Sequence, residues 1–164
     1  MKPDQIASHL PSLRRYARAL TGDAWAADDL VQDTLERACR KWLLWRGGGN
    51  LRAWLFTLMH NLYLNQRRAD APVQWVDADA LAAHPAHDAP SDTARDLERC
   101  LQRLPADQRA VLLLVTLEDM GYADAARVLG VPVGTVMSRL SRARTRLREL
   151  MDGHPPATAL RRIQ

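Results

Sequence analysis

The sequence is poor in cysteine, in lysine and in long hydrophobic stretches. It has 164 residues and two cysteines, Cys39 and Cys100, too few for a disulfide framework, so we expect both to be reduced, buried and apolar in role. The longest strongly apolar stretch, residues 110–115, is far shorter than the roughly 18–20 residues of a membrane-spanning helix. Charged side chains are scattered through residues 1–20, which argues against an export signal, and we expect a cytoplasmic protein.

The residue patterns of common catalytic sites are also missing. No nucleophile lies at a suitable spacing from a base, and the glycines at residues 47–49 are not followed by the Lys-Ser/Thr of a phosphate-binding loop. His84 and His87 would complete a four-ligand zinc set with Cys39 and Cys100, but the spacing is not that of a zinc motif. We therefore expect no enzymatic activity, no cofactor and no metal.

What the sequence does contain is a globular composition with an arginine-rich basic fraction. Hydrophobic residues make up 47% and charged residues 26%, which is enough apolar material for a core. Of the 23 basic residues only Lys2 and Lys41 are lysines. Arginine favours planar, bidentate contacts with phosphates and guanine edges, so nucleic acid is one candidate partner.

Charge divides the chain into three parts. Residues 1–70 carry a net charge of +4, residues 71–94 of −4 and residues 95–164 of +4. Prolines, alanines and four acidic residues mark the middle part as a flexible linker. These four are Asp77, Asp79, Asp88 and Asp92. We predict small domains at 1–70 and 95–152, joined by the linker 71–94 and followed by a short tail, 153–164.

Apolar residues recur every three or four positions in both predicted domains, which is the pattern of amphipathic helices. No segment alternates as a strand would. We therefore predict an all-α fold, with two small helical domains. Helices are expected at residues 11–20, 23–45, 51–68, 93–103, 106–117, 122–129 and 133–151.

The last two of these helices are typical of a helix-turn-helix motif. A short helix, a turn with glycine at 130–132 and a basic helix follow one another. Residues 133–148 contain five arginines and no acidic residue. An exposed basic helix without a ligand would have the same charge, but the preceding turn favours insertion into the major groove of DNA.

Several motifs resemble the sigma-70 family of bacterial transcription initiation factors. GTVMSRLSRAR at residues 134–144 resembles region 4 of that family, and LPADQR at 104–109 matches the entry to this region. ADDLVQDTLERA at 27–38 resembles region 2, as do AWLF at 53–56 and the arginine pair at 67–68.

The order of the motifs, the short linker and the absence of other sigma regions resemble the extracytoplasmic-function (ECF) subgroup. The resemblance covers about residues 10–150. It implies an all-α factor that binds core RNA polymerase, recognises the −35 and −10 promoter elements and helps to melt the DNA. It also implies an anti-sigma partner that masks both domains.

The resemblance assigns the basic helix to the −35 element. Helical spacing places Met137, Ser138, Ser141, Arg142 and Thr145 on or near its outer face, where serine and arginine can read base edges. The candidate −35 residues are Thr135, Met137, Ser138, Arg139, Ser141, Arg142 and Arg144. The family usually has a basic residue where Met137 stands, so its promoter preference does not transfer directly.

The glycine loop and the helix expected at 51–68 are assigned by resemblance to the −10 element. Amides would read an extruded base of the melted strand, and arginines would hold phosphates. The candidates are Asn50, Arg52, Asn61, Asn65, Arg67 and Arg68. For Trp54 we favour a core role over a DNA contact.

Acidic and amide side chains share one face of the helix that carries the region 2 motif. Asp29, Asp33 and Glu36 lie at i, i+4 and i+7, with Gln32 beside them. By itself this pattern is more typical of ordinary solvent-facing charge, but the resemblance implies that the face docks on core RNA polymerase. The acidic linker either passes through the basic RNA-exit path of the polymerase or is a solubilising tether.

Two other functions fit parts of the sequence. A stand-alone helix-turn-helix repressor or activator would bind its operator without polymerase, usually as a dimer. The region 2 motif argues against it. A redox-sensing module or enzyme would use Cys39 or Cys100.

Overall fold

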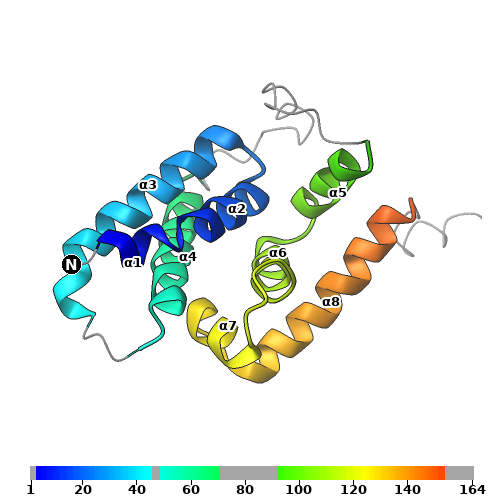
Figure 1. Cartoon of the computed structure of the whole chain (residues 1–164). Helices are drawn as coiled ribbons and strands as arrows, with labels where there is room; N and C mark the ends of the chain where they lie inside the picture. Colours follow the sequence, from blue (N-terminus) through cyan, green and yellow to red (C-terminus); the bar gives the residue numbers. More distant parts are fainter. Residues whose placement is uncertain (1–2, 46–48, 71–91, 154–164) are drawn as a thin grey trace, which may run out of the picture.

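The structure is a computed structural model that describes residues 3–45, 49–70 and 92–153 (Figure 1). The predicted linker lies almost entirely outside the described residues, as do His84 and His87. The described part consists of helices and turns only, which confirms the all-α prediction. None of its helices is long and apolar enough to cross a membrane.

The N-terminal half is a bundle of helices that begin and end at recognisable caps. Gly22, in a left-handed conformation with φ of 70°, ends α2, because its amide reaches back to the Arg18 carbonyl. Asp23 then caps α3, and its carboxylate accepts the Ala26 amide at 3.1 Å. The elements are α1 (Pro3–Ala7), α2 (Leu10–Thr21), α3 (Ala24–Lys41), the 3-10 turn η1 (Trp42–Leu44) and α4 (Leu51–Asp70).

The C-terminal half contains the helix-turn-helix at the residues that the sequence predicted. Gly130, with φ of 65°, ends the first of the two helices, and Pro132 precedes the second. The elements are α5 (Asp92–Gln102), α6 (Ala106–Leu112), the π-helical turn η3 (Leu113–Leu117), α7 (Tyr122–Leu129) and α8 (Val133–Met151).

Three elements differ from the sequence prediction. The helix expected at 23–45 ends at Lys41 and continues as η1. The helix expected at 106–117 widens into the π-helical turn η3 at Leu113. The five-residue α1 was not predicted, because so short a helix shows too little periodicity.

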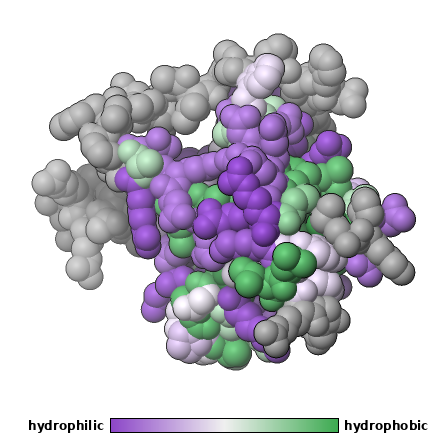
Figure 2. All heavy atoms as spheres, turned by 90° about the vertical axis from the view of Figure 1, so that its left-hand side faces the viewer, coloured by the Kyte–Doolittle hydropathy of each residue, from purple (hydrophilic) through white to green (hydrophobic). Residues whose placement is uncertain are grey.

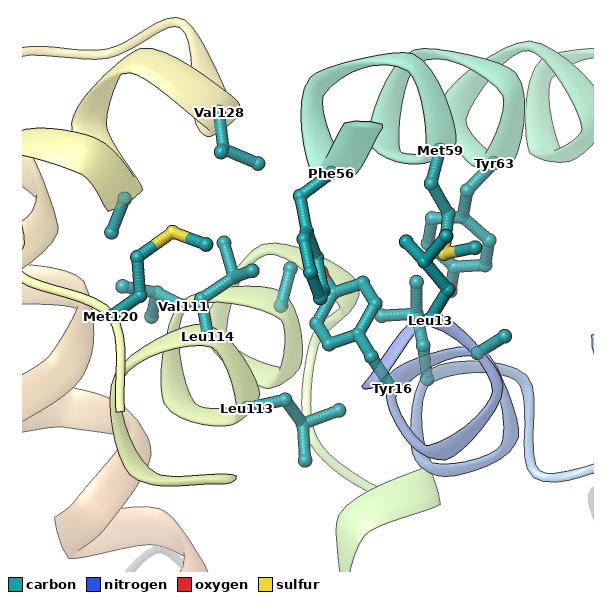
Figure 3. Packing of buried hydrophobic residues seen from close by; sticks show 14 of the residues in the cluster. Leu13, Tyr16, Phe56, Met59, Tyr63, Val111, Leu113, Leu114, Met120 and Val128 are labelled. Carbon is teal, nitrogen blue, oxygen red and sulfur yellow. The ribbon is translucent and has the colours of Figure 1, made fainter. Parts of the chain in front are cut away.

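The two halves share one continuous hydrophobic core (Figure 3). Tyr16 of α2 and Phe56 of α4 meet edge to face, with ring centroids 5.2 Å apart. Both rings point towards Val111 and Leu114 of the C-terminal half (Figure 3). The sequence left the relative placement of the two halves open, and the structure packs them against each other.

One predicted burial is wrong. Cys39 is exposed on α3, whereas Cys100 of α5 is buried as expected. The apolar face of α3 is centred on Leu30, Val31 and Ala38, and Cys39 lies just beyond its edge.

Candidate nucleic-acid interface

The outer face of α8 is open to solvent. Val136, Leu140 and Ala143 are buried against the other helices of the C-terminal half, and this fixes the orientation of α8. The predicted −35 residues on the opposite side are exposed. They are Met137, Ser138, Ser141, Arg142 and, on the flank, Arg144. This face therefore presents small polar groups and two guanidinium groups in the way that a recognition helix requires.

A groove runs beside this face, between α8 and the turn that joins α5 to α6. Its volume is about 460 Å³. The lining residues are Arg103, Pro105, Gln108, Ser141, Arg142, Thr145, Arg146 and Glu149. The prediction from sequence missed Arg103 and Arg146. Arg146 follows Arg142 by one helical turn, so helical spacing could have found it, whereas only the tertiary structure brings Arg103 to this groove.

Arg139 is less available than its neighbours on α8. Its guanidinium lies 3.6 Å from the Asp107 carboxylate of α6, and only 27% of the side chain is exposed. It also lies near His60 of α4, where burial, assisted by the charge of Arg139, lowers the pKa of the histidine to about 4. His60 is therefore neutral at physiological pH.

The polar face of α4 carries three exposed candidates for the −10 element. Asn61, Asn65 and Arg68 follow one another at i, i+4 and i+7, so they share one side of the helix. Arg67 lies apart from them. Its guanidinium stacks 5.7 Å from the ring centroid of Tyr63 and donates to the Tyr63 hydroxyl at 3.2 Å.

Asn50 and Arg52, the other two −10 candidates, bind groups of the C-terminal half. Asn50 caps α4 by accepting the Ala53 amide at 3.1 Å, and its Nδ2 donates to Asp124 of α7 at 3.1 Å. Arg52 donates to the Glu118 carboxylate at 2.9 Å. In this conformation both residues are therefore engaged within the chain.

Trp54 belongs to a tryptophan cluster at the edge of the core, as favoured from the sequence. Trp42, Trp45 and Trp54 have ring centroids 5.1 to 6.4 Å apart. Next to them, the side chains of Leu43 and Leu44 are exposed in η1.

The candidate polymerase-binding residues of α3 are all exposed, on the opposite side of the helix from the core. These are Asp29, Gln32, Asp33 and Glu36. Asp33 accepts a hydrogen bond from Gln66 at 3.3 Å, and Glu36 pairs with Arg40 one turn later. The exposed surface on the left-hand side of Figure 1 is largely hydrophilic (Figure 2).

Basic side chains join the acidic ones near Glu36. A shallow hollow of about 380 Å³ lies there, and its walls carry three basic and two acidic side chains. Its lining residues are Asp33, Glu36, Arg37, Arg40, Lys41 and Leu62. A partner that recognises the carboxylates alone would contact the N-terminal part of the face.

Two family descriptions match the chain, one in each half. Residues 6–60 match the Sigma2 domain of PhyR, and residues 94–147 match Sigma-70, region 4. The first match spans α2, α3 and the first half of α4, and it ends just before the exposed Asn61, Asn65 and Arg68. The second match contains the helix-turn-helix.

Curated relatives cover most of the chain. The ECF RNA polymerase sigma factor EcfG of Rhodopseudomonas palustris is 41% identical over 153 residues, which are 90% of this chain and 83% of the relative. The ECF RNA polymerase sigma factor SigM of Mycobacterium tuberculosis is 37% identical over 150 residues, 87% of this chain and 73% of the relative.

Solved structures agree with this relationship. The sigma factor RpoE of Bartonella quintana, in complex with the anti-sigma factor NepR, is 38% identical and has a TM-score of 0.78, covering 91% of this chain and 95% of that one. CnrH, in complex with the cytosolic domain of CnrY, is 29% identical with a TM-score of 0.69, covering 93% and 88%. The chain, similar to these proteins in both halves, belongs to the ECF RNA polymerase sigma factors.

Proposed function

We propose that this sigma factor uses three exposed helical surfaces to direct core RNA polymerase to promoters. The outer face of α8 reads the −35 element, the polar face of α4 engages the −10 element, and the acidic face of α3 binds the polymerase. The predicted domains, 1–70 and 95–152, would carry these tasks, and the chemistry of RNA synthesis would remain with the polymerase in the cytoplasm.

The outer face of α8 is the observation that carries this proposal. Ser138, Ser141 and Arg142 are exposed on a helix whose opposite side is buried, and the helix follows a turn of helix-turn-helix type. Arg103 and Arg146 add positive charge along the adjoining groove. Such a surface can contact base edges with its centre and phosphates with its flank.

The α4 face adds the second contact. Amide groups of Asn61 and Asn65 can donate and accept hydrogen bonds on an unstacked base, while Arg68 can bind a phosphate. Since each domain alone offers a small surface, the polymerase acts as the scaffold that makes the two weak contacts act together. The free protein would bind DNA poorly.

In-vitro transcription with bacterial core polymerase on a pooled promoter library tests the proposal. New, sequence-specific transcripts should appear when the protein is added. Asp33→Arg should abolish them by weakening polymerase binding, and Arg142→Ala should reduce them by weakening −35 recognition. Arg95→Ala is the matched control, because Arg95 is an exposed arginine on α5 that does not line the groove beside α8.

Two outcomes would contradict the proposal. Specific DNA binding by the protein alone, with no polymerase-dependent transcripts, would show a stand-alone regulator. A loss of activity on replacing Cys39 and Cys100 by serine, with the protein still folded, would point to a redox module.

An anti-sigma partner is a further part of the proposal. Two of the similar solved proteins, RpoE and CnrH, are in complex with NepR and with CnrY, respectively. Such a partner would be a protein that binds this sigma factor and suppresses the specific transcripts. Mutations on the exposed surfaces of α3 or α8 should abolish its binding.

A further inference from the structure

The outer face of α8 carries a large apolar side chain among its polar groups. Met137 is the fifth residue of α8, and 53% of it is exposed. Val133, one turn earlier on the same side of the helix, is also exposed. Met137 therefore adds little to the core of the C-terminal half and is available for contact with a ligand.

The position of Met137 on the recognition helix is one where bases are read. In helix-turn-helix proteins, residues in the N-terminal part of the second helix reach base edges in the major groove. Met137 and Ser138 lie in the first two turns of α8, while Val136 and Leu140 are buried against the core. DNA that docks on the outer face of α8 would meet Met137 with its base edges.

The surroundings of Met137 on α8 are uncharged. The nearest neighbours of a residue on a helix surface are those three and four positions away. For Met137 these neighbours are Val133, Gly134, Leu140 and Ser141. None of the four carries a charge, so the contact that Met137 makes with DNA is apolar in character.

The nearby arginines of α8 are directed elsewhere. The guanidinium of Arg139 lies 3.6 Å from the Asp107 carboxylate of α6. Arg142 lines the groove between α8 and the turn that joins α5 to α6, about 140° around the helix from Met137. Arg144 is on the same side as Met137 but about 10 Å further along the axis, which corresponds to about three base pairs. A guanine that faces Met137 would therefore lack a guanidinium partner.

The bases differ in what they present to an apolar side chain in the major groove. Guanine presents two acceptors, adenine an acceptor and an amino group, and cytosine an amino group, whereas thymine presents a methyl group at C5. A thioether side chain cannot replace the water that the acceptors of guanine lose. It can pack on a methyl group, and the unbranched methionine side chain adapts to the position of that group. The chemistry of Met137 therefore matches thymine.

Ser138, which follows Met137, matches the adenine that pairs with thymine. The Ser138 hydroxyl donates to the Thr135 carbonyl at 3.1 Å, so its proton is used within the helix. Its oxygen can still accept a hydrogen bond from a base. The amino groups of adenine and cytosine are donors of this kind, whereas guanine offers only acceptors in the major groove. An apolar group beside an acceptor thus fits the major-groove edge of a T·A base pair.

We propose that Met137 is a specificity-determining residue of the −35 contact and selects a thymine through its 5-methyl group. Ser138 accepts a hydrogen bond from the amino group of the paired adenine. The proposal rests on the function proposed above for the outer face of α8. It names the base pair that one position of the −35 element carries and makes guanine unfavourable in place of the thymine.

Selection from a promoter library with a randomised −35 element tests the proposal. The holoenzyme, assembled from bacterial core polymerase and this protein, is incubated with the library, and the bound promoters are sequenced. The wild type should enrich a T·A pair at one position, and Met137→Ala should lose the enrichment at that position only. Met137→Arg should enrich guanine there, because arginine binds the O6 and N7 atoms of guanine.

Removal of the methyl group from the DNA isolates the contact. Uracil in place of the selected thymine lacks the 5-methyl group and keeps every hydrogen-bonding group. It should weaken binding of the wild-type holoenzyme about threefold to tenfold, as expected for the loss of one buried methyl group. Met137→Ala should bind the two promoters equally. Ser138→Ala should keep the uracil effect, because it removes only the contact with adenine.

Met151 offers a matched control on the same helix. It is also an exposed methionine, at the last position of α8, about 21 Å along the axis from Met137. Met151→Ala should leave the selected sequence and the uracil effect unchanged. Because Met137 is exposed, its replacement should also leave the helix content unchanged, which circular dichroism measures.

The possible failures are distinguishable. A uracil effect that persists in Met137→Ala would assign the methyl contact to another residue and overturn the proposal. A −35 sequence that depends on Arg142 but not on Met137 would leave the proposed function standing and refute the role of Met137. The absence of any enriched −35 sequence, with no effect of Arg142→Ala, would refute both.

Discussion

The arginines of α8's outer face and those of the contact between the halves have the same chemistry and opposite surroundings. Arg142 and Arg144 extend into solvent, where they are available to a ligand. Arg109 is 7% exposed and donates to carbonyls of both halves. Net charge alone does not distinguish these two groups, although only the first can contribute to DNA binding.

The carboxylates show the same contrast. Asp29 and Asp33 are exposed on α3, whereas Glu118 is buried between two arginines. An exposed charge tunes orientation and association rate, while a buried one controls conformation. The mutations below test this comparison by asking whether the same residue type has different effects in the two environments.

The largest effect is expected from Arg109→Ala. It leaves the carbonyls of Leu20 and Leu104 without their donor, and we expect a loss of about 3 kcal/mol in the free energy of unfolding. Urea denaturation followed by circular dichroism measures it. Arg144→Ala on the outer face should change stability by less than about 0.5 kcal/mol. Equal losses of stability in the two variants would show that burial of the arginine does not decide its contribution.

The next effect is a pH dependence that His60 produces. Burial lowers its pKa to about 4, against 6.5 in the unfolded chain, so the unfolded state binds the proton more readily. Stability should be flat above pH 6.5 and fall by up to about 3 kcal/mol as the pH drops towards 4. Chemical denaturation at several pH values measures this. His60→Leu should flatten the slope in that window, and an unaltered slope would assign it to other groups.

Helix caps offer a smaller effect and a closer comparison. Asp23 caps α3 within the N-terminal half, while Asn50 caps α4 and also binds Asp124 of the C-terminal half. Asp23→Ala and Asn50→Ala should each reduce stability by about 1 kcal/mol. Only Asn50→Ala should also increase the radius of gyration. A similar expansion in Asp23→Ala would show that the cap, and not the contact with Asp124, is responsible.

The smallest effect on stability belongs to Arg142, whose expected role is in DNA binding. Arg142→Ala should change stability by less than about 0.5 kcal/mol. In holoenzyme, it should reduce the slope of log affinity against log salt by about 1 if the arginine contacts a phosphate. Promoter binding at several salt concentrations measures this slope. An unchanged slope with lower affinity would indicate a base contact without phosphate neutralisation.

Much of the local structure could be predicted from the sequence. The end of α7 and the start of α8 lie where Gly130 and Pro132 place them, since glycine permits the left-handed conformation that ends a helix and proline suits the position before a helix begins. The exposure of Asp29, Asp33 and Glu36 followed from helical spacing. The domain boundaries at residues 70 and 95 stay a prediction.

Local patterns failed where the neighbours of a residue decide its environment. Cys39 was expected to be buried because it continues an apolar run, but it lies beyond the edge of the face that α3 buries. The widened turn η3 packs against α2 of the other half, and a contact between segments so far apart in the sequence leaves no local pattern from which to predict it.

The helices, their caps and the two polar faces are encoded locally, because hydrophobic periodicity and capping chemistry act between residues a few positions apart. The tertiary structure alone decided which charges remain available. Arg15 and Glu118 are 103 positions apart, and Asn50 and Asp124 are 74 apart. No local signal encodes such pairs, because they form only when the shared core brings the two halves together.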